Sequence, residues 1–287
     1  MKNSRALYQE AVKKITLSES VDEIKSMVLL LMEHTFGISR TDIVAGKPIV
    51  PEPQQLSQLD QYIERMNTGE PVQYILEEAY FCGRIFHVNP SVLIPRPETE
   101  VLISVILSWE KKYRPEGAGR IKVLDIGTGS GCIPVTLRLE WPLSDVYATD
   151  ISAAALKVAR HNAERHQAEI SFLKHDILHD DIPFGDIDVI ISNPPYVTRS
   201  EANDMKQNVL GFEPHGALFV PDDDPFIFYK EIVSKSKAVL AHAGLLAVEI
   251  NEKFGREIAG IFHAEGFIHV EVVNDVDGKP RVVQGLC

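Results

Sequence analysis

The sequence predicts an α/β fold with a Rossmann-like, mostly parallel sheet that ends in an antiparallel C-terminal hairpin, preceded by a small all-α domain. From residue 121 to the C-terminus, apolar β-forming segments alternate with amphipathic helical segments, which is the pattern of a parallel sheet covered on both faces. About the first seventy residues show helical periodicity only. A chain of 287 residues has room for both parts.

Five strands are expected in the sheet, and each is an apolar run between turn residues. They cover residues 121–126, 145–149, 169–174, 187–192 and 245–250. Two further runs, 268–273 and 280–285, flank Asp277 and Gly278. A short connection of this kind predicts a hairpin, which we expect at the edge of the sheet.

The N-terminal part carries the signals of several short helices. Leu7, Ala11 and Ile15 fall on one helical face, and Ser20 followed by Glu23 is a capping pattern before an apolar run. The proline-rich residues 47–53 cannot continue a helix, so they connect two of them.

A linking hairpin is expected between the two parts, because residues 80–88 alternate β-forming side chains around Gly83. A further helix begins near Glu98, just after two prolines. These signals divide the chain into a helical domain over 1–69, a hairpin linker over 70–95 and an α/β domain over 96–287.

Composition and charge restrict the class of function. The net charge is −12, from 29 basic and 41 acidic residues, and such a surface repels a phosphate backbone, so we expect no nucleic-acid partner. No signal sequence precedes the first helix and no apolar run reaches membrane-spanning length, so we expect no membrane. The three cysteines are far apart without metal-ligand spacing, which favours a reducing, cytoplasmic location and no metal.

Three glycines, Gly127, Gly129 and Gly131, stand at alternate positions after the first predicted strand. Glycines let a ligand approach the backbone closely. The dinucleotide fingerprint requires its third glycine at position 132, where this chain has Cys132, so a nicotinamide or flavin site fits poorly. The alternating form resembles the loop that binds the methionine part of S-adenosyl-L-methionine in class I methyltransferases. A tight turn without a ligand is the alternative. The residues expected to bind the cofactor here are Asp125, Gly127, Thr128, Gly129, Ser130 and Gly131.

Acidic residues follow the next two strands. Asp150 lies at the carboxyl end of the second strand, beside the glycines, where a carboxylate can accept both ribose hydroxyls. A helix N-cap is the alternative for Asp150. Asp176, with its neighbour Ile177, ends the third strand in the same way and is expected at the adenine, with a plain turn as the alternative.

Asn193, Pro194, Pro195 and Tyr196 follow the fourth strand and so project from the same edge. A planar amide or amine nitrogen is a poor nucleophile and has to be positioned. The Asn193 side-chain oxygen and the Pro194 carbonyl can accept both of its N–H bonds, and Tyr196 can stack on the flat acceptor. These residues, with Asn193 also near the cofactor, predict a methyltransferase that acts on a planar nitrogen.

With these residues in view, the chain resembles the PrmC/HemK family, which methylates the glutamine of the Gly-Gly-Gln motif in bacterial class 1 peptide chain release factors. The likeness runs through most of the length, in residues 69–75, 92–100, 127–131, 193–196, 212–218 and 278–283. It implies a helical N-terminal domain that grips the release factor, a hairpin linker and a catalytic domain. We expect the enzyme to be a cytoplasmic monomer. The resemblance also implies that residues 193–196 hold the glutamine and that the segment from Arg96 to Glu100 helps to close the site.

Other interpretations remain open at this point. Glu77 and Glu78 depart from the family pattern, and residues 81–83 resemble a sister branch that methylates a ribosomal-protein glutamine, whereas residues 95–100 favour the release-factor branch. An adenine-N6 methyltransferase uses an Asn-Pro-Pro-Tyr loop by the same hydrogen-bond logic. A non-catalytic binding module and a nicotinamide dehydrogenase share the expected fold.

Overall fold

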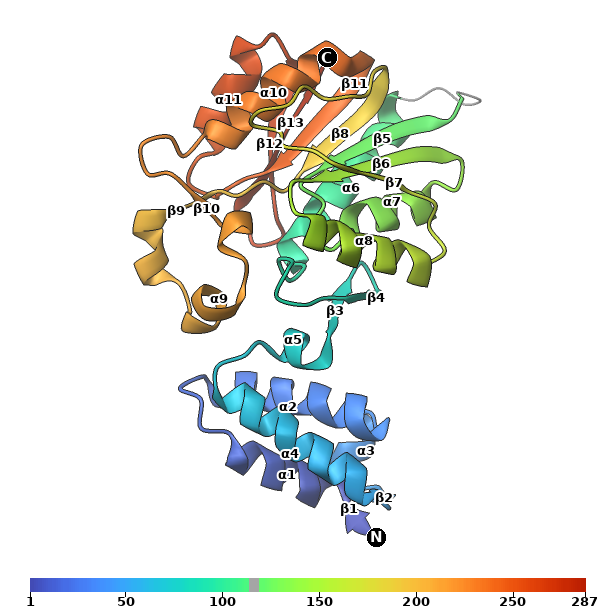
Figure 1. Cartoon of the computed structure of the whole chain (residues 1–287), viewed down its shortest axis with the longest axis vertical. Coiled ribbons are helices and arrows are strands. Elements are labelled where there is room, and N and C mark those ends of the chain that lie inside the picture. Colours follow the sequence, from blue (N-terminus) through green and yellow to red (C-terminus); the bar gives the residue numbers. More distant parts are fainter. Residues whose placement is uncertain (114–118) are drawn as a thin grey trace. The chain divides into compact units, whose positions relative to one another are not determined.

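The computed structural model describes residues 1–113 and 119–287, which form two compact units (Figure 1). We call residues 1–78 with 206–212 the helical unit, and residues 79–205 with 213–287 the sheet unit. The chain therefore passes between the units three times, because the short segment 206–212 returns to the helical unit from within the sheet unit.

Helices make up most of the helical unit. They are α1 (Ser4–Lys14), α2 (Val21–Phe36), α3 (Arg40–Val44), α4 (Pro53–Asn67), α5 (Val72–Leu76) and α9 (Gln207–Phe212), with a short antiparallel pair β1 (Lys2–Asn3) and β2 (Pro48–Ile49). The Ser20 side chain accepts a hydrogen bond from the Glu23 N–H at 3.2 Å and caps α2 as predicted. A common core of Leu7, Val28, Leu31, Leu59, Ile63 and Met66 joins α1, α2 and α4. The expected helical N-terminal region is confirmed.

Segment 206–212 is tied to the helical unit by charge. The Lys206 ammonium group lies 3.0 Å from the Glu19 carboxylate and 2.7 Å from that of Glu23. These are exposed pairs, so each adds little stability, about 0–1 kcal/mol.

The sheet unit begins at residue 79, within the hairpin of β3 (Glu78–Phe81) and β4 (Arg84–His87), which turns at Cys82 and Gly83. Its remaining elements are η1 (Pro97–Thr99), α6 (Glu100–Tyr113), β5 (Ile121–Ile126), α7 (Cys132–Glu140), β6 (Ser144–Asp150), α8 (Ala153–Arg165), β7 (Ser171–Lys174), β8 (Ile187–Ser192), β9 (Val197–Thr198), η2 (Arg199–Asp204), η3 (His215–Ala217), β10 (Phe219–Val220), α10 (Ile227–Val239), β11 (Leu240–Glu249), α11 (Gly255–Ala264), β12 (Ile268–Asn274) and β13 (Pro280–Leu286).

Seven strands form the main sheet in the order β12-β13-β11-β8-β5-β6-β7. The five strands from β11 to β7 are parallel, and the hairpin β12-β13 is antiparallel to them at one edge, as predicted. In the register, Ile126 pairs with Thr149 of β6 and with Ser192 of β8. The three central strands therefore end at the same level, and the residues that follow them share one edge of the sheet.

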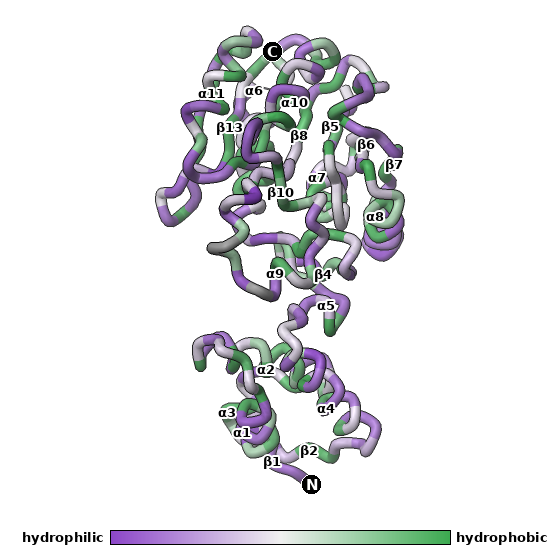
Figure 2. Tube along the Cα trace, turned by 60° about the vertical axis from the view of Figure 1, so that its left-hand side comes forward, coloured by the Kyte–Doolittle hydropathy of each residue, from purple (hydrophilic) through white to green (hydrophobic). Residues whose placement is uncertain are grey.

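Helices cover both faces of this sheet, and successive strand residues alternate between two cores. Val123 packs with α6 and α7, whereas the next residue, Leu124, packs with α10 and α11. The central strands β5 and β8 are buried on both sides and consist mostly of apolar residues (Figure 2), as expected for a parallel sheet. In the described parts of the chain no helix is long and apolar enough to cross a membrane.

Strand β11 differs from the prediction, because it begins at Leu240 instead of residue 245. Its register against β8 shifts between Leu240 and Leu245. Ala243, with φ of +59°, and Gly244 lie in this irregular part, where the apolar pattern is broken.

Candidate active site

The glycine loop (residues 127–131) is held by backbone hydrogen bonds. The N–H groups of Gly127 and Thr128 both donate to the carbonyl of Thr149 at 2.9 Å. All three glycines have positive φ angles, of +76°, +54° and +79°. A Cβ atom at Gly127 or Gly129 would meet no heavy atom within 4 Å. The loop therefore has open space on the side where a ligand would approach.

Gly131 has a different role in the loop. A Cβ atom there would lie 3.0 Å from the Cβ of Ala159 and 3.1 Å from its Cα, both in α8. This glycine therefore lets the loop pack closely on the helix. The carbonyl of the neighbouring Ser130 accepts a hydrogen bond from Asn162 Nδ2 at 2.8 Å.

Asn162 links the glycine loop to the β3-β4 hairpin. Its Nδ2 also donates to the carbonyl of His87 at 2.9 Å, and its Oδ1 accepts from the His87 N–H at 2.7 Å. Asn162 is fully buried. Its role was not predicted from the sequence, although a polar residue next to Ala163, in an amphipathic segment between two predicted strands, was a usable signal.

Asp150 follows β6 and binds the glycine loop directly. Its Oδ2 accepts from the Gly129 N–H at 2.9 Å and its Oδ1 accepts from the Ser152 N–H at 2.8 Å. Burial raises the pKa of Asp150, and the two N–H donors oppose this rise. The helix N-cap of α8 is Ser152, so the N-cap alternative for Asp150 is wrong.

Asp125 is fully buried in β5, two residues before Gly127. Among the described residues neither of its carboxylate oxygens has a hydrogen-bond partner of ordinary geometry. Burial raises its pKa to about 7; the Thr128 side chain lowers it, and the nearby Asp150 adds to the rise. A buried carboxylate with two unused acceptors is a high-energy feature, and a cationic group beside it would stabilise the ionised form.

Asp176 lies in the loop after β7, where it makes local contacts. Its Oδ1 accepts from the Leu178 N–H at 3.0 Å, and its Oδ2 lies 2.8 Å from His179 Nδ1. Burial raises the pKa of Asp176, but the hydrogen bonds from His179 and the Leu178 N–H lower it by more, so the net shift is downward. The neighbouring Ile177 is buried in the core that contains α10.

The Asn193 loop (residues 193–196) follows β8. Asn193 Nδ2 donates to the Thr99 hydroxyl at 3.2 Å, so its amide is fixed by a residue of η1. Tyr196 is packed against the core beside α10, and its hydroxyl donates to Glu249 Oε1 at 3.2 Å. Burial and the Glu249 carboxylate hold the pKa of Tyr196 far above its usual value.

Thr99 and Glu249 are buried, at 3% and 2% exposure, and neither was predicted from the sequence as part of this site. Glu249 is the last residue of β11, and in the register its neighbour Val248 pairs with Ser192, directly before Asn193. Burial raises the pKa of Glu249 to about 7, although the hydroxyls of Thr99 and Tyr196 lower it.

Arg96 forms an ion pair with Glu213, whose side chain is 1% exposed. The second carboxylate oxygen of Glu213 accepts from the Ile94 N–H at 3.3 Å. The pair holds the segment that leads into η1, and therefore helps to place Thr99.

The structure brings the glycine loop, Asp150 and the Asn193 loop to one edge, because they follow the adjacent strands β5, β6 and β8. Asp176 follows β7, one strand further out, and the His175 N–H donates to the Asp150 carbonyl at 3.1 Å. The arrangement can hold an extended ligand along the strand ends and a second, planar group at Asn193.

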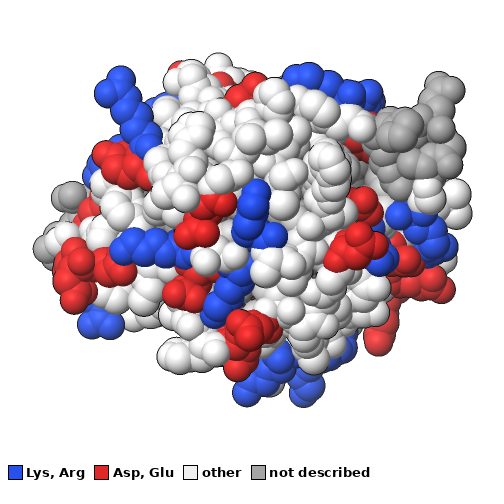
Figure 3. Space-filling model, turned by 90° about the horizontal axis from the view of Figure 1, so that it is seen from above, with Lys and Arg blue, Asp and Glu red and all other residues white. Residues whose placement is uncertain are grey.

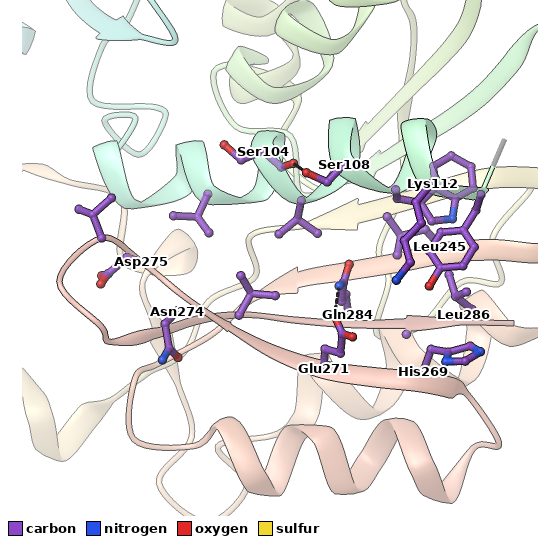
Figure 4. A pocket seen from close by; sticks show the side chains of 17 residues that line it. Ser104, Ser108, Lys112, Leu245, His269, Glu271, Asn274, Asp275, Gln284 and Leu286 are labelled. Atoms are coloured by element: carbon purple, nitrogen blue, oxygen red, sulfur yellow. Dashed lines mark hydrogen bonds between the residues drawn. The ribbon is translucent and has the colours of Figure 1, made fainter.

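A cavity of about 470 Å³ lies elsewhere in the sheet unit, between α6 and the hairpin β12-β13 (Figure 4). Ser104 and Ser108 line it from α6, and the hydrogen-bonded pair Gln284 and Glu271 from the hairpin. None of the residues predicted for the site lines this cavity.

Charge is mixed on the face seen in Figure 3, where Lys and Arg are interspersed with Asp and Glu.

Comparisons with known proteins agree with this geometry. Residues 102–211 match the family described as Methyltransferase small domain, and residues 7–76 match the PrmC N-terminal domain. The release factor glutamine methyltransferase of Bacteroides thetaiotaomicron is 40% identical over 91% of this chain and 92% of its own length. That of Flavobacterium psychrophilum is 34% identical over 99% and 98%. The hMettl16 catalytic domain, crystallised with MAT2A 3′UTR hairpin 6, shares the fold, with a TM-score of 0.54 at 15% identity over 70% of this chain and 74% of that one.

The sheet, the edge that carries the glycine loop and the family matches define a methyltransferase. Within that class, the chain belongs to the release factor glutamine methyltransferase family. The resemblance to the PrmC/HemK family is thereby confirmed.

Proposed function

We propose that this enzyme transfers a methyl group from S-adenosyl-L-methionine to the side-chain amide nitrogen of a release-factor glutamine, in the Gly-Gly-Gln motif of class 1 peptide chain release factors. The observation that carries the proposal is the common edge formed by the glycine loop, Asp150 and the Asn193 loop. The names of relatives that cover almost the whole chain support the choice of acceptor.

The residues at this edge fit the cofactor. Gly127 and Gly129 have open space beside them, and Asp125 offers two buried oxygens without ordinary partners in the described structure, where the cationic amino group of the methionine part would be stabilised. Each Asp150 oxygen already accepts one N–H and keeps a lone pair for a ribose hydroxyl. Asp176 and Ile177 lie one strand further out, where the adenine would be expected.

When bound, the cofactor supplies a methyl group on a positively charged sulfur, a strong electrophile. The chain's own residues then have to position a weak nucleophile. The Asn193 Oδ1 and the Pro194 carbonyl accept hydrogen bonds from the two N–H groups of the glutamine amide. They also stabilise the positive charge that develops on its nitrogen. Pro195 stiffens the loop, and Tyr196 anchors it through the hydrogen bond from its hydroxyl to Glu249 Oε1. We propose these as the substrate-holding groups, with Arg96 placing the neighbouring segment through Glu213.

The helical unit supports a protein acceptor, because its residues 7–76 match the PrmC N-terminal domain. We propose that the domain over residues 1–69 binds the release factor, that residues 70–95 link it to the catalytic domain over residues 96–287, and that the enzyme acts as a cytoplasmic monomer.

The test is methyl transfer from labelled cofactor, with the methylated peptide located by mass spectrometry. We expect transfer to the Gly-Gly-Gln peptide of a release factor, and none to ribosomal protein or duplex DNA. Transfer to either of those acceptors and not to release factor would overturn the proposal.

Asn193→Ala should lose turnover by about 100-fold or more, because positioning acts on the barrier. Cofactor affinity should change little, since one hydrogen bond contributes roughly 0.5–1.5 kcal/mol to binding. Calorimetry and the transfer assay measure the two effects separately. The exposed Asn274→Ala is the matched control and should retain both. Equal losses of binding and rate would make Asn193 a cofactor or structural residue.

A further inference from the structure

The side-chain amide of Asn193 has two possible orientations, and they have opposite chemistry. An amide oxygen that faces the substrate accepts hydrogen bonds from its N–H groups, whereas an amide NH₂ group is itself a donor and repels those N–H groups. Oxygen and nitrogen have similar size, so packing alone distinguishes the two poorly. The orientation therefore has to be set by a partner whose own polarity is fixed.

Thr99 is that direct partner. Its hydroxyl accepts from Asn193 Nδ2 at 3.2 Å, and its side chain is buried. A hydroxyl can also donate its single proton elsewhere. If that proton pointed at Asn193 instead, the amide would turn its oxygen to Thr99 and its nitrogen to the substrate.

Above its pKa of about 7, Glu249 is ionised and supplies the fixed polarity, because an ionised carboxylate only accepts hydrogen bonds. The Thr99 side chain interacts with the Glu249 carboxylate and lowers its pKa, as does the Tyr196 hydroxyl, which donates to Oε1 at 3.2 Å. The other oxygen, Oε2, is buried and accepts no hydrogen bond of ordinary geometry from the described residues. The ionised Glu249 therefore favours the orientation in which the Thr99 hydroxyl proton faces the carboxylate. A lone pair of the Thr99 hydroxyl oxygen is then left to accept from Asn193.

We propose that Thr99 and Glu249 are positioning residues that set the amide orientation of Asn193 and so make its oxygen the acceptor for the substrate nitrogen. The inference rests on the proposed function only for its effect on turnover. The three side chains come from η1, β11 and the end of β8, so the register of the sheet and the Arg96–Glu213 pair both serve this arrangement.

Thr99→Val and Thr99→Ser form a matched pair. Valine keeps the shape of threonine but removes the hydroxyl, whereas serine keeps the hydroxyl. With release factor as substrate, we expect Thr99→Val to lower kcat by about 10- to 100-fold while KM and cofactor affinity stay within about threefold. Thr99→Ser should retain kcat within about threefold. Equal kcat in the two variants would overturn the proposal.

Glu249→Gln tests the second member, because its amide can donate to Thr99 and reverse the polarity of the chain of hydrogen bonds. We expect a kcat loss similar to that of Thr99→Val, and the double variant should be no slower than the slower single variant. If the kcat losses of the two single variants multiplied in the double variant, Thr99 and Glu249 would act independently, which would contradict the proposal.

A measurement without any acceptor keeps the inference separate from the proposed function. In the free protein, the Asn193 side-chain NH₂ signal can be assigned by its loss in Asn193→Ala. We expect one of its protons to exchange with solvent about tenfold more slowly in wild type and Thr99→Ser than in Thr99→Val. Equal exchange in all three would overturn the inference even if release factor is methylated. The expected difference would sustain it even if the acceptor proved to be another protein.

Discussion

The glycine loop and the Asn193 loop follow neighbouring strands of one sheet, but they are held in different ways. The glycine loop is fixed by backbone hydrogen bonds to the end of β6 and by Asp150, 21 residues from Gly129. The Asn193 loop is fixed by side chains, Asn193 by Thr99 and Tyr196 by Glu249, which are 94 and 53 residues away.

This difference fits the two tasks that we propose for the loops. A loop whose backbone approaches a cofactor closely needs backbone angles that most residues avoid, and hydrogen-bonded glycines provide them. A loop that holds a reacting nitrogen needs a side chain in one orientation, and buried partners on other elements provide that. Substitutions in the glycine loop should therefore disturb the backbone conformation, whereas substitutions around the Asn193 loop should disturb the direction of its hydrogen bonds.

Gly131→Ala should have the largest effect on stability. The residue has a φ of +79°, and the new Cβ would lie 3.0 Å from Ala159 Cβ and 3.1 Å from its backbone Cα. Strain and overpacking together should cost about 2–4 kcal/mol of unfolding free energy, measured by chemical denaturation.

Gly185→Ala is the matched control for this change, because Gly185 is exposed, has no positive φ and would meet nothing within 4 Å. It should be neutral or slightly stabilising. A similar loss in both variants would show that close packing of the glycine loop on α8 is unimportant.

Asp125→Asn should change the pH dependence of stability. Burial raises the pKa of Asp125 to about 7, from its ordinary value of 3.8. The folded state thus binds more protons than the unfolded state between these pH values, so the contribution of Asp125 is full at low pH and is lost as pH rises through 7. The asparagine side chain cannot ionise. Between pH 5 and pH 8 the unfolding free energy of the variant should therefore rise by roughly 2–3 kcal/mol relative to that of wild type.

Denaturation of both free proteins at the two pH values tests this effect of Asp125. The raised pKa of Glu249 acts in the same direction but is present in both proteins, so it cancels in the difference. A constant difference between the two pH values would mean that the Asp125 carboxylate ionises normally.

The glycine loop was predictable because its signals are local. Strands β5 and β8 occupy the predicted ranges 121–126 and 187–192, because strands buried on both faces consist mostly of apolar residues. The alternating glycines and Asp150 then follow from the rule that parallel strands end at one edge. The first part of β11 was missed because its apolar pattern is broken where the register against β8 shifts.

The support of the Asn193 loop was not predictable in the same way. Thr99 stands in a proline-started turn where a hydroxyl is common, and nothing near it in the sequence points to Asn193. Glu249 had one usable signal, a charge in the otherwise apolar run 245–250. A buried charge needs a partner, but the identity of that partner depends on tertiary contacts.

Tyr196→Phe should have the smallest effect and most directly tests whether the Asn193 loop is held by its side chains. It removes the hydroxyl that donates to Glu249 Oε1 and leaves the ring in its core contacts. We expect a loss of about 1–2 kcal/mol in unfolding free energy, because a buried acceptor loses a donor. The loss should be larger at pH 8 than at pH 5, since the hydroxyl lowers the pKa of Glu249, which is about 7, and so stabilises its ionised form. Denaturation of both proteins at the two pH values measures this. No loss at either pH would place the tyrosine's contribution in its ring, which phenylalanine keeps, and the anchoring of the loop would then be apolar packing instead of a hydrogen bond to Glu249.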